Sequence, residues 1–227
     1  MSKNGKTPKG TPPPPVTYYE DLLLAFVRGR AEIPVENVQE ALDEALLRDL
    51  HTDKFKRKKV LPRVEKTLEL LKALKPTDVL DVGCGRGTAL WPMMEAFPSV
   101  PFTGVDAYEG RSVDLRAMRD AGITQIADAH AMDAENLSGL ARNQFDVATI
   151  LEVLEHLETP EDAVKELIRV TRRAVVMSVP SVPDWNPDHL RVYTAGELKN
   201  LWLRNGAVSV TITEVPKHFV AVATLRP

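Results

Sequence analysis

The chain has 227 residues, of which 44% are hydrophobic, and a formal net charge of −3. This length suits one large α/β domain, or one domain with an extension. No apolar run approaches the roughly 20 residues of a bilayer-spanning helix, and the polar, proline-rich start does not resemble a signal peptide. The single cysteine, Cys84, excludes an internal disulfide framework and a four-cysteine zinc site. We therefore expect a cytoplasmic protein with no membrane partner.

The first quarter of the chain differs in composition from the rest. Residues 1–16 are polar and proline-rich, so we expect a disordered tail. Helical spacing of apolar residues over 18–30 and 35–50 predicts a helical extension spanning residues 17–59. Its basic run, residues 54–59, could meet phosphates or another acidic partner, or could simply be a solvated helix start or linker.

From residue 60 onward, short apolar segments alternate with amphipathic ones. Strands are predicted at 78–83, 101–105, 123–127, 145–151, 173–179, 207–214 and 218–225. Helices are predicted from Pro62, and at 88–97, 111–121, 134–141, 160–171 and 194–204. This alternation predicts a doubly wound α/β domain over residues 60–227, with a mostly parallel sheet covered on both faces.

The most informative segment lies at residues 79–88, Val-Leu-Asp-Val-Gly-Cys-Gly-Arg-Gly-Thr. It predicts a buried strand that carries Asp81 and ends in a tight turn with Gly83, Gly85 and Gly87. Glycine in such a turn permits positive φ and lets a ligand lie against the backbone. The Gly-x-Gly-x-Gly spacing differs from the Gly-x-Gly-x-x-Gly of dinucleotide-binding folds.

Acidic residues are also predicted at the ends of the next three strands. They are Asp106 after the second strand, Asp128 after the third and Glu152 after the fourth. Ligands of doubly wound sheets bind outside these carboxyl ends. A carboxylate such as Asp106 can accept both hydroxyls of a ribose, although a helix cap or a loop acid is the alternative for Asp106 and for Asp128.

Taken together, the glycine turn and the ordered acids resemble the class I S-adenosylmethionine-dependent methyltransferases over roughly residues 60–225. The resemblance implies a seven-stranded, Rossmann-like sheet whose last strands form an antiparallel hairpin. It also implies the residues that would bind S-adenosylmethionine: Asp81, Gly83, Cys84 and Gly85 at the methionine, Asp106 and Ala107 at the ribose, Asp128 and Ala129 at the adenine, and Leu151 and Glu152 towards the methyl group. Cys84 would act through its backbone.

A second segment of chemical interest is Glu152-Val-Leu-Glu155-His156. If it starts a helix, the two carboxylates and the imidazole share one face. Such a set can bind a divalent ion, with His189 approaching from beyond the fifth strand. Glu155 and His156 are also the candidates for catalysis, as groups that orient the acceptor or act as a base.

The same segment resembles the metal site of RNA 3′-terminal 2′-O-methyltransferases and that of metal-dependent ubiquinone-pathway O-methyltransferases. Many methyltransferases of small molecules without a known metal share it as well, so a metal-free site stays open. A small-molecule acceptor is the leading hypothesis, and the 54–59 run leaves RNA open. Trp185 is either an ordinary packing residue or, from a loop near the expected mouth, a residue that stacks on the acceptor. The competing classes are a nicotinamide-dependent oxidoreductase and a non-catalytic binding subunit.

Overall fold

The computed structural model describes residues 17–56 and 59–226. The expected tail over residues 1–16 and part of the basic run, residues 57–58, lie outside the described residues. The helices are α1 (Tyr18–Ala31), α2 (Val38–Leu47), α3 (Pro62–Leu74), α4 (Leu90–Ala96), α5 (Glu109–Asp120), α6 (Pro160–Val170) and α7 (Ala195–Arg204), with short 3₁₀ turns η1 (Asp53–Phe55) and η2 (Leu154–His156). The strands are β1 (Val79–Val82), β2 (Phe102–Asp106), β3 (Ile126–Ala131), β4 (Phe145–Leu151), β5 (Thr171–Pro180), β6 (Ser209–Val215) and β7 (His218–Thr224).

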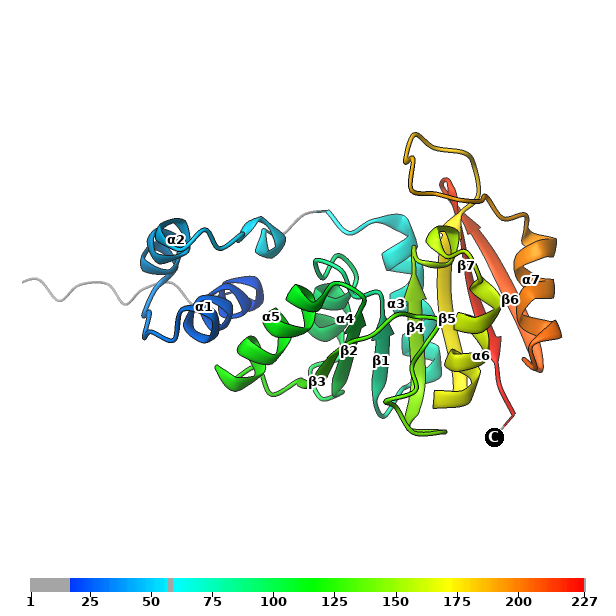
Figure 1. Ribbon diagram of the computed structural model, residues 1–227, viewed down its shortest axis with the longest axis horizontal. Coiled ribbons are helices and arrows are strands. Elements are labelled where there is room, and N and C mark those ends of the chain that lie inside the picture. Colours follow the sequence, from blue (N-terminus) through cyan, green and yellow to red (C-terminus); the bar gives the residue numbers. More distant parts are fainter. Residues whose placement is uncertain (1–16, 57–58, 227) are drawn as a thin grey trace, which may run out of the picture.

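The seven strands form one sheet in the order β3-β2-β1-β4-β5-β7-β6 (Figure 1). The first five pair in parallel, and β7 runs antiparallel to both β5 and β6. The expected mostly parallel sheet with a terminal hairpin is therefore confirmed. Within the described residues, no helix is long and apolar enough to cross a membrane.

Alternate residues of the central strands feed two separate hydrophobic cores. Val79 and Val176 join the core shared with α1, α3, α4 and α5, whereas Leu80 and Val175 join the core shared with α6 and α7. This alternation follows from the period of two of a β-strand, since both faces of a parallel sheet are buried. The result is a three-layer sandwich that fixes the carboxyl ends of β1, β2 and β4 side by side.

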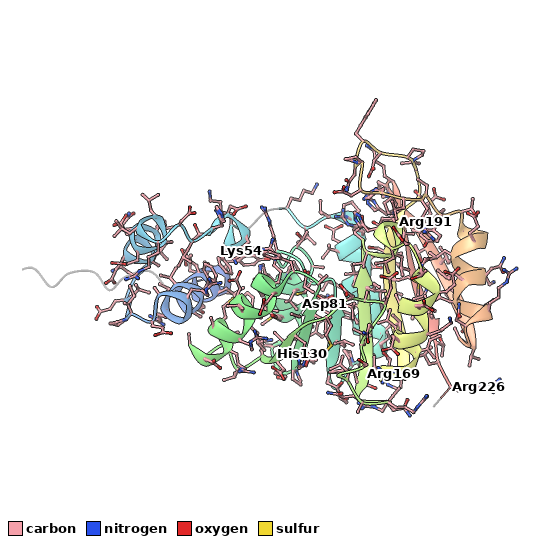
Figure 2. All side chains as sticks on the ribbon, in the orientation of Figure 1. Lys54, Asp81, His130, Arg169, Arg191 and Arg226 are labelled. Atoms are coloured by element: carbon pink, nitrogen blue, oxygen red, sulfur yellow. The ribbon has the colours of Figure 1, made fainter. Side chains whose placement is uncertain are left out.

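The expected N-terminal helices are present. Thr17 and Glu20 form a reciprocal capping box that starts α1. The helix then packs along α5, and η1 follows α2 back towards the sheet (Figures 1 and 2). Lys54 of η1 is held between the Asp114 carboxylate on α5 and the face of the Phe26 ring, with its ammonium 3.9 Å from the ring centre. The extension is thus anchored to the sheet domain by buried contacts.

The predicted helix over residues 134–141 is wrong, because this segment forms a chain of turns between β3 and β4. Side chains of α6 bind several of its backbone groups, beside isolated turn bonds such as that from the Leu140 amide to the Leu137 carbonyl at 2.8 Å. The Glu166 carboxylate accepts from the Leu137 amide at 2.8 Å, and the Arg169 guanidinium donates to the carbonyls of Leu137 and Leu140 at 2.8 and 2.7 Å. Buried Leu137 and Leu140 still pack into the core, which explains their helix-like spacing.

Candidate functional site

The glycine turn lies directly after β1, at the carboxyl edge of the sheet. Gly83 and Gly87 have φ values of +75° and +80°, a backbone conformation that other residues adopt only with strain. A Cβ on Gly83 would lie 2.2 Å from the Val153 side chain, and one on Gly87 would lie 2.0 Å from the Trp91 ring. The turn can therefore be built only with glycine at these positions, and its backbone is open on the other side.

Asp81 lies on β1, two residues before Gly83, and its side chain is almost completely buried. The Thr149 hydroxyl on neighbouring β4 donates a hydrogen bond of 2.6 Å to its carboxylate. Burial raises the pKa of Asp81 to about 6, while the Thr149 hydrogen bond lowers it and the nearby Asp106 charge raises it slightly further. A buried carboxylate at a cavity wall favours a cationic ligand.

Asp106 is the last residue of β2 and points towards the glycine turn. Its two oxygens accept hydrogen bonds from the Gly85 amide at 2.8 Å and from the Tyr108 amide at 3.0 Å. These contacts fix the carboxylate at the edge of the sheet and tie the β2 end to the turn. The strand-end position expected for Asp106 is therefore confirmed.

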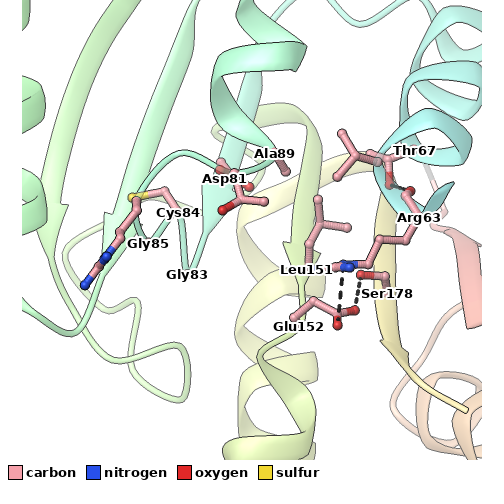
Figure 3. A pocket seen from close by; sticks show the side chains of 13 residues that line it. Arg63, Thr67, Asp81, Gly83, Cys84, Gly85, Ala89, Leu151, Glu152 and Ser178 are labelled. Carbon is pink, nitrogen blue, oxygen red and sulfur yellow. Dashed lines mark hydrogen bonds and ion pairs between the residues drawn. The ribbon is translucent and has the colours of Figure 1, made fainter. Parts of the chain in front are cut away.

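Two cavities meet over these strand ends. The first, of about 150 Å³, is lined by Arg63, Val64, Thr67, Asp81, Gly83, Cys84, Gly85, Arg86, Thr88, Ala89, Leu151, Glu152 and Ser178 (Figure 3). The second, of about 380 Å³, is lined by Val82, Gly83, Asp106, Ala107, Met132, Asp133, Ala134, Glu135, Glu152, Val153, His156 and Leu157. Because Gly83 and Glu152 line both, we describe the two cavities as one carboxyl-end groove.

Most of the residues expected to bind a cofactor line this groove, including Ala107 and Leu151. Cys84 lines the groove with its thiol buried, and its amide donates to the Val105 carbonyl at 3.1 Å. Burial, with a smaller effect of the Asp81 charge, raises the pKa of the thiol far above its ordinary value. The thiol is therefore suited to packing and not to nucleophilic chemistry.

The predicted strand-end position of Asp128 and Ala129 is wrong. Asp128 lies inside β3 opposite Thr103, three residues before Asp106, and so about 10 Å from the carboxyl edge. Its carboxylate binds the Arg119 guanidinium at 3.0 Å on the outer side of the sheet. The acid that reaches the groove after β3 is Asp133, which sequence reasoning missed although it repeats the same Asp-Ala pair five residues later.

Glu152 is the first residue after β4 and has a left-handed backbone with φ +59°. Its carboxylate accepts from the Ser178 hydroxyl at 2.7 Å and pairs with the Arg63 guanidinium at 3.4 Å (Figure 3). It also pairs with the His218 imidazole at 2.9 Å. Arg63 on α3 is a second residue that sequence reasoning missed. It brings a cation to the first cavity, and its only sequence signal was its place in the first turn of a helix.

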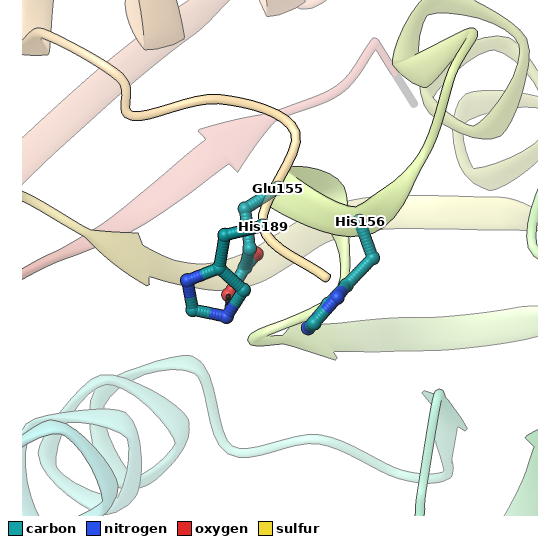
Figure 4. Close-up of side chains that lie close together, drawn as sticks. All are labelled: Glu155, His156 and His189. Atoms are coloured by element: carbon teal, nitrogen blue, oxygen red, sulfur yellow. Dashed lines mark ion pairs between the residues drawn. The ribbon is translucent and has the colours of Figure 1, made fainter. Parts of the chain in front are cut away.

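The predicted helix over the Glu-x-x-Glu-His segment is wrong as well, because only the 3₁₀ turn η2 forms there. The turn separates Glu152 from Glu155 and His156, so the four expected metal ligands do not converge. Glu155, His156 and His189 do converge, with one potential ligand atom of each within 4.8 Å of the others (Figure 4). We call these three residues the Glu-His-His cluster.

The Glu-His-His cluster contains a buried carboxylate without a hydrogen-bond donor. Both oxygens of Glu155 are buried and unpaired among the described residues, and the nearer His189 nitrogen, Nε2, is 3.9 Å away. Burial raises the pKa of Glu155 to about 8, with a smaller raising effect from the charge of Glu152. Such a group needs either a proton or a cation beside it.

The two imidazoles are oriented through their other nitrogens. His189 Nδ1 is 2.9 Å from an Asp184 oxygen, and His156 Nδ1 is 3.0 Å from the Asp188 carbonyl oxygen. Both Nδ1 atoms therefore donate, which leaves Nε2 of each neutral ring as an acceptor. Imidazoles held in this way by a carboxylate or a carbonyl are typical of metal-binding histidines.

Comparison with known proteins shows which family the chain is similar to. Residues 80–178 match the family described as "Methyltransferase domain". This segment is similar to that domain family, and the sheet around it has the strand order expected for the class I S-adenosylmethionine-dependent methyltransferase fold. The matched segment includes the glycine turn, the strand-end acids, and Glu155 and His156 of the Glu-His-His cluster. The glycine backbone and the two-part groove fit the cofactor S-adenosylmethionine.

Curated relatives match a part of the chain. The ubiquinone biosynthesis O-methyltransferase of Bordetella avium (strain 197N) is 32% identical over 103 residues, which cover 45% of this chain and 42% of that protein. The protein of the same name from Pseudomonas paraeruginosa is 34% identical over 95 residues, covering 41% and 39%. The chain thus spans about two fifths of the length of these relatives.

Solved structures show the same fold. A putative O-methyltransferase from Nostoc punctiforme has a TM-score of 0.58 at 16% identity and covers 91% of this chain and 72% of its own. The [4+2]-cyclase SpnF has a TM-score of 0.56 at 16% identity, covering 71% and 82%. Because a cyclase shares the fold, the reaction has to be argued from the site.

Proposed function

We propose that the protein transfers the methyl group of S-adenosylmethionine to a hydroxyl oxygen of a small molecule. The observation that carries this proposal is the Glu-His-His cluster beside the carboxyl-end groove. A hydroxyl is a weak nucleophile, and the cluster supplies what it lacks, a base or a cation site. The printed names of the curated relatives, which are O-methyltransferases, support an oxygen acceptor.

We propose that each wall of the groove holds one part of the cofactor. Asp81 and the backbone of Gly83, Cys84 and Gly85 would hold the cationic methionine part, with Arg63 placed to bind its carboxylate. Asp106 and Ala107 would hold the ribose. Asp133 replaces Asp128 and Ala129 as the candidate at the adenine. Leu151 and Glu152, where the two cavities meet, would lie closest to the sulfonium.

In the transfer itself, the hydroxyl oxygen attacks the methyl carbon while the carbon–sulfur bond breaks. The products are the methyl ether, S-adenosylhomocysteine and one proton. Holding the oxygen in line with the methyl group supplies much of the rate. In this proposal the ionised form of the Glu155 carboxylate takes the proton through His156, the residue of the cluster that lines the groove.

The Glu-His-His cluster also fits a divalent metal ion, with Glu155 oxygen and the Nε2 atoms of His156 and His189 as ligands. Two imidazoles and a carboxylate suit zinc, iron, manganese and similar ions. A bound ion would lower the pKa of an acceptor hydroxyl. Glu152 is not part of this proposed set, because Arg63, Ser178 and His218 already bind its carboxylate.

The test is a transfer assay with labelled S-adenosylmethionine and three acceptor pools: phenols and catechols, total RNA, and protein extract. We expect label in the small-molecule pool, lost on treatment with a chelator and restored by one divalent metal. E155Q and H189Q should lower the rate at least a hundredfold, while H51Q, a change of an exposed histidine of the N-terminal extension, should leave it unchanged.

Each other outcome of this assay contradicts a defined part of the proposal. Label in RNA would replace the small molecule by RNA. Full activity in chelator would leave Glu155 as a base without a metal. Tight binding of S-adenosylhomocysteine with no transfer to any pool would favour a non-catalytic binding subunit. The cytoplasmic location expected from the sequence stays a prediction.

A further inference from the structure

A third cavity, of about 210 Å³, lies beside the carboxyl-end groove but outside the part assigned to the cofactor. It lies between the N-terminal extension and the glycine turn, and is lined by Tyr19, Asp53, Lys54, Lys56, Lys59, Val60, Leu61, Arg86, Gly87, Thr88, Trp91 and Pro92. Arg86 and Thr88 also line the first cavity of the groove. We call it the basic cavity, because four of its residues are cationic and one is acidic.

Two of the four cations already have acidic partners. Lys54 is bound to Asp114, and Arg86 is 3.3 Å from the Asp53 carboxylate. Lys56 and Lys59 form no ion pair with any described residue, and both are exposed to solvent at the cavity. A net positive charge is therefore left at the mouth, where an anion would be attracted.

The apolar wall of the basic cavity holds one further unsatisfied group. Trp91 is only 4% exposed, and its indole Nε1 finds no hydrogen-bond acceptor among residues 17–56 and 59–226. A buried donor without an acceptor costs roughly 1–3 kcal/mol. An acceptor oxygen of a ligand entering the cavity would remove that cost, and the Leu61 and Pro92 side chains would contact the apolar remainder of the ligand.

The position of the cavity is fixed by the fold. Lys54 is buried between Asp114 and Phe26, and the Phe55 ring packs against Phe26 and Trp91 with ring centres 5.1 and 5.8 Å away. Lys54 and Phe55 thus anchor the start of the basic run beside the glycine turn, which a freely solvated linker would not need. Phe55 is buried against the sheet domain, and Lys56 follows it directly in the sequence.

We propose that the basic cavity binds a small molecule that carries a phosphate or carboxylate group on an apolar body, next to the bound cofactor. The phosphate or carboxylate contacts Lys56 and Lys59, and the body lies against Leu61 and Trp91. The site is separate from the Glu-His-His cluster, which lies on the other side of the groove. A narrow cavity suits a compact ligand better than an RNA strand, which needs an extended basic surface.

The experiment records the indole N–H signals of the protein in ¹H–¹⁵N spectra, with the three tryptophans assigned through W185F and W91F. The full-length protein is titrated with phenyl phosphate, benzoate and sodium chloride at equal ionic strength, with and without saturating S-adenosylhomocysteine. We expect phenyl phosphate or benzoate, but not chloride, to move the Trp91 signal downfield, and the stronger of the two identifies the anionic group. The shift should persist with S-adenosylhomocysteine bound.

Variants separate a built site from general charge attraction. The double substitution K56Q/K59Q should weaken binding of the organic anion at least fivefold, whereas K199Q, an exposed lysine of α7, should not. Equal binding by both variants would overturn the proposal. So would loss of the shift with S-adenosylhomocysteine, which would make the cavity part of the cofactor site, or tighter binding of a short RNA that moves the same signal. S-adenosylhomocysteine affinity, measured separately, reports on the methyltransferase proposal alone.

Discussion

The Thr149 hydroxyl donates a 2.6 Å hydrogen bond to the Asp81 carboxylate across two neighbouring strands, and both side chains are buried. The bond joins β1 to β4 near Gly83 and Glu152, which line both cavities of the groove. It is the one side-chain contact that lowers the pKa of Asp81, against burial and the charge of Asp106. Thr149 therefore keeps a buried carboxylate available for a cationic ligand.

Replacing this threonine by valine, T149V, removes the donor and keeps the side-chain shape. At pH 7.5 the ionised Asp81 would then be buried without its side-chain donor, so we expect the free energy of unfolding in urea to fall by about 1–2 kcal/mol. The loss should shrink near pH 4.5, where Asp81 is protonated. T149S retains the hydroxyl and should stay close to the wild type; an equal loss in both variants would contradict this role of the hydrogen bond.

Glu155 makes the stability of the metal-free protein depend on pH. Its pKa is about 8 in the folded state against an ordinary 4.5, so the folded protein binds the extra proton between these values. The contribution of Glu155 to the unfolding free energy is therefore complete below pH 4.5 and falls by about 1.4 kcal/mol per pH unit as the pH rises towards 8.

The substitution E155Q removes this titration and keeps the side-chain size. Urea unfolding is measured from pH 5 to 8 with a chelator present. The free energy of unfolding should fall with rising pH more steeply in the wild type than in E155Q. At pH 8, a metal ion that binds the cluster should make the wild type more stable than E155Q, because the ion binds the ionised carboxylate. Parallel pH profiles of the two proteins would show that Glu155 does not titrate in this range.

Asp106 should determine the affinity for the nucleoside part of the cofactor. In D106A, the ribose hydroxyls would lose a charged acceptor, and such hydrogen bonds contribute about 1.5–3 kcal/mol. Calorimetry should show S-adenosylhomocysteine binding weakened by about tenfold to a hundredfold. Because Asp106 also holds the Gly85 amide, a thermal melt must show that the protein is folded. D162N is the control, because the half-exposed Asp162 side chain of α6 pairs with Lys165 and does not line the groove. Unchanged affinity in D106A would remove Asp106 from the site.

The sheet could be predicted from the sequence because its strands are apolar and its turns are marked. The β1 strand, the glycine turn and Asp106 follow from residue types alone, since buried parallel strands consist of continuous apolar runs. The β3 strand could not be placed in the same way. It lies at the edge of the sheet with Asp128 and His130 only half-buried, so its polar residues look like a loop.

The three residues of the Glu-His-His cluster were among four predicted metal ligands, but the fourth, Glu152, does not join them. Helical spacing suggested that Glu152 would share a face with Glu155, but the left-handed backbone at Glu152 turns the chain and sends the two carboxylates apart. A left-handed residue other than glycine leaves no reliable signal in a sequence. Arg63 was missed for a related reason, because its contact with Glu152 joins segments that are distant along the chain.

The corrected end of β3 leads to a matched pair of substitutions, D133A and D128A. Both change an aspartate that is followed by alanine, and the two positions lie five residues apart. Only Asp133 lines the groove, whereas Asp128 binds Arg119 on the outer side of the sheet. If Asp133 contacts the adenine, D133A should weaken S-adenosylhomocysteine binding about tenfold in calorimetry, the size of one hydrogen bond.

D128A should bind as the wild type does and lose only a small amount of stability, because exposed ion pairs contribute about 0–1 kcal/mol. The reverse result, weak binding in D128A alone, would restore the adenine contact to the position first expected from the sequence.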